Sequence, residues 1–238
     1  MNEVLELIEK KKEEFVKIEF FQFMQDKSID PRTRLAWTPC FAPLSITFGE
    51  LNKYVLRKEP TNNPVQDLIN KHTYEDDHHW IWLLEDIEKL GLNRTLKLND
   101  ALKFIWSEET QKIRMFSYEM YAMCTYYNDP ILNLVFIESV EATGNVGQSI
   151  ILEVAKELQS ITKQEYRFWG ENHLSVEQGH TTGMDDVVPF LENIHITEQQ
   201  KEIAFELVER VFEGFSQSLN EMMVYAQKYS SQESFALA

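Results

Sequence analysis

The sequence predicts an all-α protein, a single domain built as a helical bundle of about seven helices. Three observations support this fold class. The 238 residues include only 8 Gly and 7 Pro, which is few for a sandwich or barrel because those folds need frequent turn residues. Apolar residues make up 43% of the chain, enough for a substantial core. They recur at helical spacing in stretches that end at capping or helix-breaking residues.

Apolar spacing and breaker residues define the first helices. Residues 2–26 place their apolar side chains largely at helical spacing, and "DKSIDPR" then ends the helix. A second apolar stretch runs over residues 35–56, where Pro43 predicts a break or kink near the middle.

Capping signals bound the later helices. Asn63 is expected to be an N-cap with Pro64 at the first helical position, and the pattern then continues to Leu90 before Gly91 ends it. Further helices are expected from Asn99 or Asp100 to about Tyr127, from Pro130 after an Asp129 cap to about Ile161, over 165–180, and from a Thr197 to Gln200 capping box to about Tyr229.

No Ser/Pro/Gly-rich linker, low-complexity tract or repeat divides the chain. Residues 1–230 are therefore expected to form one domain and 231–238 a flexible C-terminal tail.

The formal net charge of −16 argues against nucleic acid and membrane partners, because both surfaces attract Lys and Arg. No run of about 18 apolar residues is present, and the N-terminal stretch lacks the apolar core of a signal peptide. Cys40 and Cys124 are too few for a disulfide framework, so reduced thiols are expected. These features favour a cytoplasmic protein, and a homodimer remains open.

Polar residues form a stripe on the helix expected over 64–90. At about 100° per residue, His72, Glu75 and His79 fall within roughly 60° of one another, so their side chains can converge. Asp77 and His78 point elsewhere and are expected to be exposed.

A second stripe lies in the strongly apolar stretch 130–161. Glu138 and Glu141 sit three residues apart on one face, where burying a carboxylate costs several kcal/mol unless it is paired, protonated or metal-bound. Small residues follow Glu141, which suits a helix that lines a central cavity.

The third stripe is "HLSVEQGH", in which Glu177 and His180 each lie within about 40° of His173 and so share its face. Imidazoles and carboxylates suit Fe, Mn or Zn, and inward-facing Glu and His from several helices of a bundle build dinuclear sites. The alternative is that the histidine stripes are solvated faces and that Arg167 or Lys103 satisfies the central glutamates. Three such stripes in a chain with 6 His favour the metal hypothesis.

The three stripes resemble those of the haem-oxygenase-like di-iron oxidases and oxygenases, part of the wider TenA/haem-oxygenase-like superfamily. The resemblance covers residues 35 to about 225 and is carried by "LEDIEKLG", "VEATG" and the late H-x3-E-x2-H. It implies a haem-oxygenase-like, TenA-like helical bundle. The family's late motif matches His173, Glu177 and His180, and its central glutamate fits Glu141 better than Glu138.

The sequence departs from the family on the early helix. Relatives often present a Glu seven residues before the ligand His, whereas the residue seven before His79 is His72. Either His72 replaces the carboxylate or Glu75 supplies it from the same face. The resemblance then implies a metal-dependent oxidoreductase with two Fe ions, or Mn in their place, and O2 as co-substrate. Its substrate would be a small amino-acid-like or fatty-acid-like molecule, and no catalytic residue is predicted beyond the metal ligands.

Two other branches of the superfamily offer alternatives. Haem oxygenases resemble this architecture but need a proximal His on the first helix, and this chain has no His before position 72, so no haem is expected. A metal-free TenA-like protein that binds or hydrolyses a small molecule is the second alternative. Its nucleophile could only be Cys124, which has no evident base nearby and is expected to be a buried structural thiol.

Overall fold

The computed structural model describes residues 1–177 and 188–230, and it is helical with no strand in those ranges. Residues 178–187 and the predicted C-terminal tail at 231–238 lie outside the described residues. The α-helices are α1 (Asn2–Phe15), α2 (Glu19–Gln25), α3 (Pro31–Arg34), α4 (Ala42–Leu51), α5 (Pro64–Asp76), α6 (His79–Lys89), α7 (Leu98–Ile105), α8 (Gln111–Tyr127), α9 (Pro130–Thr162), α10 (Glu171–Glu177), α11 (Val188–Glu192) and α12 (Glu198–Ser230). Short turns of other helical type lie at Thr38–Phe41, Asn52–Leu56 and Glu108–Thr110.

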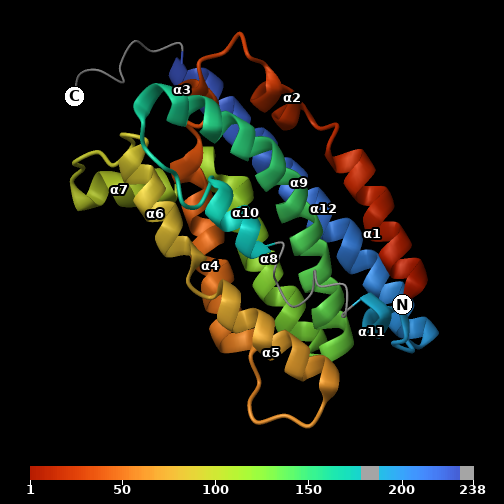
Figure 1. Cartoon of the computed structure of the whole chain (residues 1–238). Coiled ribbons are helices and arrows are strands. Elements are labelled where there is room, and N and C mark those ends of the chain that lie inside the picture. The colour runs from red at the N-terminus through yellow and green to blue at the C-terminus, as the bar shows by residue number, and fades with distance from the viewer. Residues whose placement is uncertain (178–187, 231–238) are drawn as a thin grey trace.

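Helix α9 is the central element of the bundle. It contacts α1, α2, α3, α5, α8, α10 and α12, and it runs through the middle of the molecule, with α1 toward one edge and α6 and α7 toward the other (Figure 1). A helix that is enclosed in this way is apolar nearly all round, as the sequence "ILNLVFIESVEATGNVGQSIILEV" predicts. A polar side chain on α9 is therefore directed into the protein interior.

Three of the predicted N-caps are confirmed, whereas Asn99 and Asp100 lie inside α7, whose N-cap is Lys97. Asn63 Oδ1 accepts hydrogen bonds from Val65 N at 2.9 Å and Gln66 N at 3.3 Å. Asp129 Oδ1 accepts from Ile131 N at 2.8 Å and Leu132 N at 3.1 Å, which begins α9. Thr197 and Gln200 form the predicted capping box, since each accepts a hydrogen bond from the backbone N–H of the other. These local signals fix where three helices start.

The helix predicted over 64–90 is wrong in one respect, because it is two helices. Helix α5 ends at Asp76 and α6 begins at His79. Arg57 Nη2 donates to Thr73 O at 2.8 Å and to Asp77 Oδ2 at 2.7 Å. In an unbroken helix Thr73 O would accept the N–H of residue 77, so these contacts draw the chain out of helical register at the break.

Other long predicted helices are also divided, which gives more helices than the expected seven. The stretch 2–26 forms α1 and α2, and the stretch 100–127 forms α7 and α8 on either side of a short turn. The break predicted near Pro43 is present, because the turn Thr38–Phe41 ends where α4 begins, and Pro43 lies in the first turn of α4, where a missing N–H costs nothing.

No helix in the described parts of the chain is both long and apolar enough to cross a membrane.

Candidate metal centre

The break between α5 and α6 brings three polar side chains together. His72 and Asp76 lie on the last turns of α5, and His79 is the first residue of α6. His72 Nε2 is 3.1 Å from Asp76 Oδ2, and His79 Nδ1 is 3.3 Å from Asp76 Oδ1. The two oxygens of one carboxylate thus face two different imidazoles.

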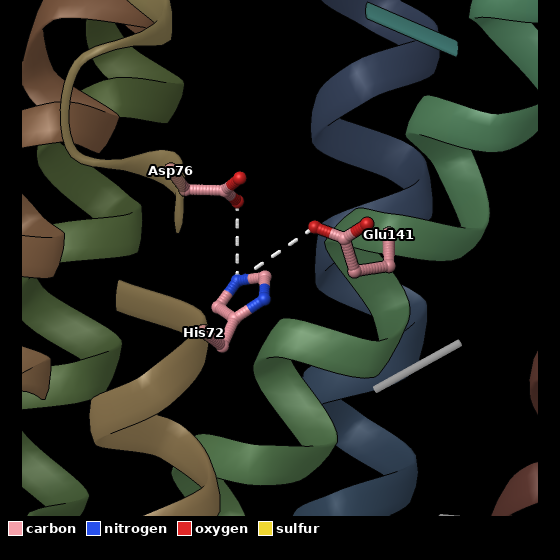
Figure 2. Close-up of side chains that lie close together, drawn as sticks. All are labelled: His72, Asp76 and Glu141. Carbon is pink, nitrogen blue, oxygen red and sulfur yellow. Dashed lines mark ion pairs between the residues drawn. The ribbon is translucent and has the colours of Figure 1, made fainter. Parts of the chain in front are cut away.

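Helix α9 contributes Glu141 to the same group. Glu141 Oε1 lies 3.7 Å from His72 Nε2, and Figure 2 shows both Glu141 and Asp76 joined to the His72 imidazole by dashed lines. One donor atom each from His72, Asp76 and Glu141 can be chosen so that all three lie within 4.8 Å of one another, and all three residues are buried. This is a metal-capable group of two carboxylates and one imidazole.

Helix α10 contributes His173 on the other side of His79. His173 Nε2 is 3.1 Å from His79 Nδ1, and the two rings meet edge to face. Trp82 stacks on His79 with 4.2 Å between ring centroids, which fixes the plane of that imidazole. The donor atoms of five residues therefore follow one another in the order Glu141, His72, Asp76, His79, His173.

A cavity of about 100 Å³ opens onto these residues. Among the described residues, its polar wall contains four of these five donor residues, all except His72, together with Ser45 and Gln148, but neither Lys nor Arg. Its apolar wall includes Leu44 and Phe48 of α4, Met120 of α8 and Phe215 of α12. The metal-capable group thus faces a small space that is otherwise mainly apolar.

Glu138 lies one turn before Glu141 on α9 but does not line this cavity. Its Oε1 is buried and has no hydrogen-bond partner among the described residues. Burial raises the pKa of Glu138 to about 7, and the nearby His72 opposes the rise. Of the two glutamates predicted from the sequence, the structure brings Glu141 into the group.

The structure separates His72 and Glu75, which were both predicted as ligands on the early helix. His72 is fully buried within the group, whereas Glu75 is half-buried and belongs neither to the group nor to the cavity wall. Asp76, which the sequence interpretation left out, supplies the carboxylate instead. In the late motif, His173 reaches the site. The structure does not describe the side chain of Glu177, and His180 lies outside the described residues.

The alternative of solvated faces does not hold for the three described histidines of these stripes, nor for Asp76 and Glu141. Relative exposure is 0% for His72, 5% for Asp76, 6% for His79, 9% for Glu141 and 4% for His173. The cations considered as partners for the glutamates are engaged elsewhere. Arg167 pairs with Glu85 at 3.3 Å and Lys103 with Asp100 at 3.4 Å.

Cys124 is buried on α8 and does not line the cavity. Burial raises the pKa of its thiol far above the ordinary value, which disfavours the thiolate. The prediction that this thiol is buried is confirmed.

No protein-family model matches the chain, and no curated protein matches it. Among solved structures, the chain is similar to a domain of unknown function with a heme oxygenase-like fold from Shewanella denitrificans OS217. The TM-score is 0.63 at 15% sequence identity, and the match covers 100% of this chain and 97% of that one. The fold and the site together define an all-α protein of heme oxygenase-like fold with a buried group of His, Asp and Glu that could bind metal.

Proposed function

We propose that this protein is a non-haem dinuclear metal oxidase or oxygenase, with two Fe ions or Mn in their place, that activates O2 to oxidise a small organic substrate. The observation that carries the proposal is the spacing of the donor atoms. Asp76 Oδ2 is 3.1 Å from His72 Nε2, and Asp76 Oδ1 is 3.3 Å from His79 Nδ1. Metal–ligand bonds of about 2.0–2.2 Å place neighbouring ligand atoms of one ion roughly 3.0–3.5 Å apart.

The donors divide into two sets around the Asp76 carboxylate. His72, Asp76 Oδ2 and Glu141 would hold one ion, and Asp76 Oδ1, His79 and His173 would hold the other. Glu177 and His180 would complete the two sets from the late motif, as the resemblance to the di-iron oxidases implies. This arrangement also accounts for His72 in place of the family's glutamate, since the carboxylate is supplied one turn later, by Asp76.

The protein residues have three tasks in such a reaction. Bound Fe(II) supplies the electrons and the open coordination positions that O2 activation requires. Asp76 and Glu141 offset the charge of the ions, and the histidines complete the sets as neutral ligands. The apolar wall formed by Leu44, Phe48, Met120 and Phe215 excludes water and receives the apolar part of a substrate. This wall is compatible with the amino-acid-like or fatty-acid-like molecules that the resemblance implies.

The test is iron stoichiometry. Metal-free protein is equilibrated with Fe(II) under anaerobic conditions, bound iron is measured per chain, and O2 is then admitted while visible absorption is recorded. We expect about two irons per chain and a transient visible band. His79→Ala should lose at least one iron. The matched control is His78→Ala, because His78 is the adjacent histidine but is exposed and does not line the cavity.

The outcomes separate the functions considered. Wild-type protein that binds no iron at micromolar concentrations would eliminate the oxidase and leave a metal-free binding protein. Equal iron loss in His78→Ala and His79→Ala would show that binding does not depend on this group.

A further inference from the structure

Helix α6 begins with His79, and its next two turns contact residues 165–169, the segment that leads into α10. Lys89 Nζ donates to Glu165 O at 2.8 Å, and Arg167 pairs with Glu85 at 3.3 Å while lying over the Trp82 ring. The strongest contact is made by Asp86, which is fully buried. One helix therefore positions both His79 and the approach to His173.

Asp86 accepts three backbone hydrogen bonds from this segment. Its Oδ1 accepts from Arg167 N at 2.7 Å, and its Oδ2 accepts from Phe168 N at 2.8 Å and Trp169 N at 3.0 Å. Hydrogen bonds to a carboxylate are stronger than those between neutral groups. The turn before α10 is thus fastened to α6 through one side chain.

The peptide group between Phe168 and Trp169 has a contact at each end. Its N–H donates to the Asp86 carboxylate, and its carbonyl oxygen, Phe168 O, lies 2.9 Å from His173 Nδ1. A carbonyl can only accept, so Nδ1 of His173 carries the proton and donates it to Phe168 O. Nε2 of His173, which faces His79, is then the unprotonated nitrogen.

This tautomer requires the amide of Gln148 to be turned. Gln148 Nε2 is placed 2.8 Å from His173 Nδ1, and a protonated Nδ1 cannot accept from an N–H, so the amide oxygen of Gln148 should face the imidazole instead. The oxygen and nitrogen of a glutamine amide are assigned from such networks. In the opposite orientation Gln148 Oε1 is buried without a partner among the described residues.

We propose that Asp86 is a positioning residue that acts on His173 through the Phe168–Trp169 peptide group. A carboxylate at the N–H end polarises the peptide and makes its carbonyl a better acceptor, which holds His173 in the Nδ1–H tautomer with Nε2 directed into the site. Ligand histidines in metalloproteins commonly donate their second N–H to a carboxylate or carbonyl, and here a carboxylate reaches the histidine through one peptide unit.

The cost of burying Asp86 supports a role beyond fastening the turn. Burial raises the pKa of Asp86, and the three backbone hydrogen bonds offset that rise only in part. The charged carboxylate is therefore less favourable in the folded protein than in water.

The first experiment measures metal affinity and rests on the proposed function. Co(II) is titrated into metal-free protein and followed by visible absorption. Asp86→Asn should weaken Co(II) binding roughly 10- to 100-fold, as substitutions of the residues that orient a ligand histidine do in other metalloproteins. Glu85→Gln is the matched control, since Glu85 is the adjacent acid on α6 and touches the side chain of Arg167 instead of the peptide. In a His173→Ala background Asp86→Asn should have no further effect. Equal weakening in both backgrounds, or unchanged affinity of Asp86→Asn, would overturn the proposal.

The second experiment needs no metal, so its failure is distinguishable from failure of the proposed function. Nitrogen NMR of the histidine rings in metal-free protein should show His173 with Nδ1 protonated in wild type and a mixture of tautomers in Asp86→Asn. An unchanged His173 signal in the folded variant would assign Asp86 a purely structural role. If Asp86→Asn does not fold, Asp86→Ser replaces it, because the smaller side chain leaves room for water.

Discussion

Replacing Glu138 by Gln should make the metal-free protein more stable at neutral pH and change how its stability depends on pH. The ordinary pKa of 4.5 rises to about 7 in the folded protein, so the folded state holds the proton more tightly than the unfolded chain does. The stabilisation from this group is fully present below pH 4.5 and is lost as pH rises through 7. At about 1.4 kcal/mol per pKa unit the whole effect is about 3 kcal/mol.

The assay is urea unfolding of the metal-free wild type and Glu138→Gln at several values between pH 5 and 8. Other titrating groups are common to both proteins, so the difference in unfolding free energy isolates Glu138. This difference should shift by roughly 2 to 3 kcal/mol in favour of the glutamine variant between pH 5 and 8. Glu153→Gln, at an exposed site on α9, should show no such shift. A pH-independent difference for Glu138→Gln would refute the buried, protonated glutamate.

Three further substitutions test packing and capping, each by the urea midpoint. Gly214→Ala should destabilise by roughly 1 to 3 kcal/mol, because its Cβ would lie 2.2 Å from Cδ2 of Phe116; an unchanged midpoint would contradict this close approach. Asp129→Ala should cost about 1 kcal/mol through the lost cap of α9, and a neutral result would mean that packing alone starts the helix. Leu98→Asp should stay within about 0.5 kcal/mol, because Leu98 is 72% exposed; a larger loss would reveal burial at α7.

The parts of the fold that the sequence predicts well are those set by neighbouring residues. The caps at Asn63 and Asp129 are contacts between residues two or three apart, so their residue types reveal them. The break between α5 and α6 depends on Arg57, which is 16 residues from Thr73. Nothing in the apolar spacing of 64–90 contains that contact, and a single long helix is therefore what the spacing predicts.

For the site too, the sequence predicts the residues that are indicated by their neighbours on the same helix. The need of a carboxylate in an apolar helix for a partner indicates Glu138 and Glu141 alike, and only the family resemblance favours Glu141; His173 is indicated by its spacing within the late motif. The choice between Glu75 and Asp76 could not be made in this way. Around a helix axis, at about 100° per residue, the side chains of Glu75 and Asp76 each point about 50° away from the mean direction of His72 and His79. They do so on opposite sides of that direction. Only the packing of α5 against α9 decides which of them faces inward.

This ambiguity leads to the most specific prediction about the metal centre. If Asp76 replaces the carboxylate that stands seven residues before the ligand histidine in the di-iron oxidases that the sequence resembles, then the carboxylate should be transferable back to that position. Asp76→Ala removes both oxygens that face His72 and His79, so bound iron should fall from about two to one or fewer per chain. Adding His72→Glu to Asp76→Ala should restore iron binding, because it returns one carboxylate to the buried position seven residues before His79.

The control for this transfer is His72→Gln in the Asp76→Ala background. Glutamine has the shape of glutamate without its charge, so it distinguishes a carboxylate ligand from a simple change in packing. Iron should stay low in the glutamine variant and return in the glutamate variant. Equal iron in both would mean that side-chain shape governs binding, and two irons in Asp76→Ala alone would mean that Asp76 is not a ligand. Restoration by glutamate only would show that one carboxylate is required in this part of the site and that either of two positions, one turn apart, can supply it.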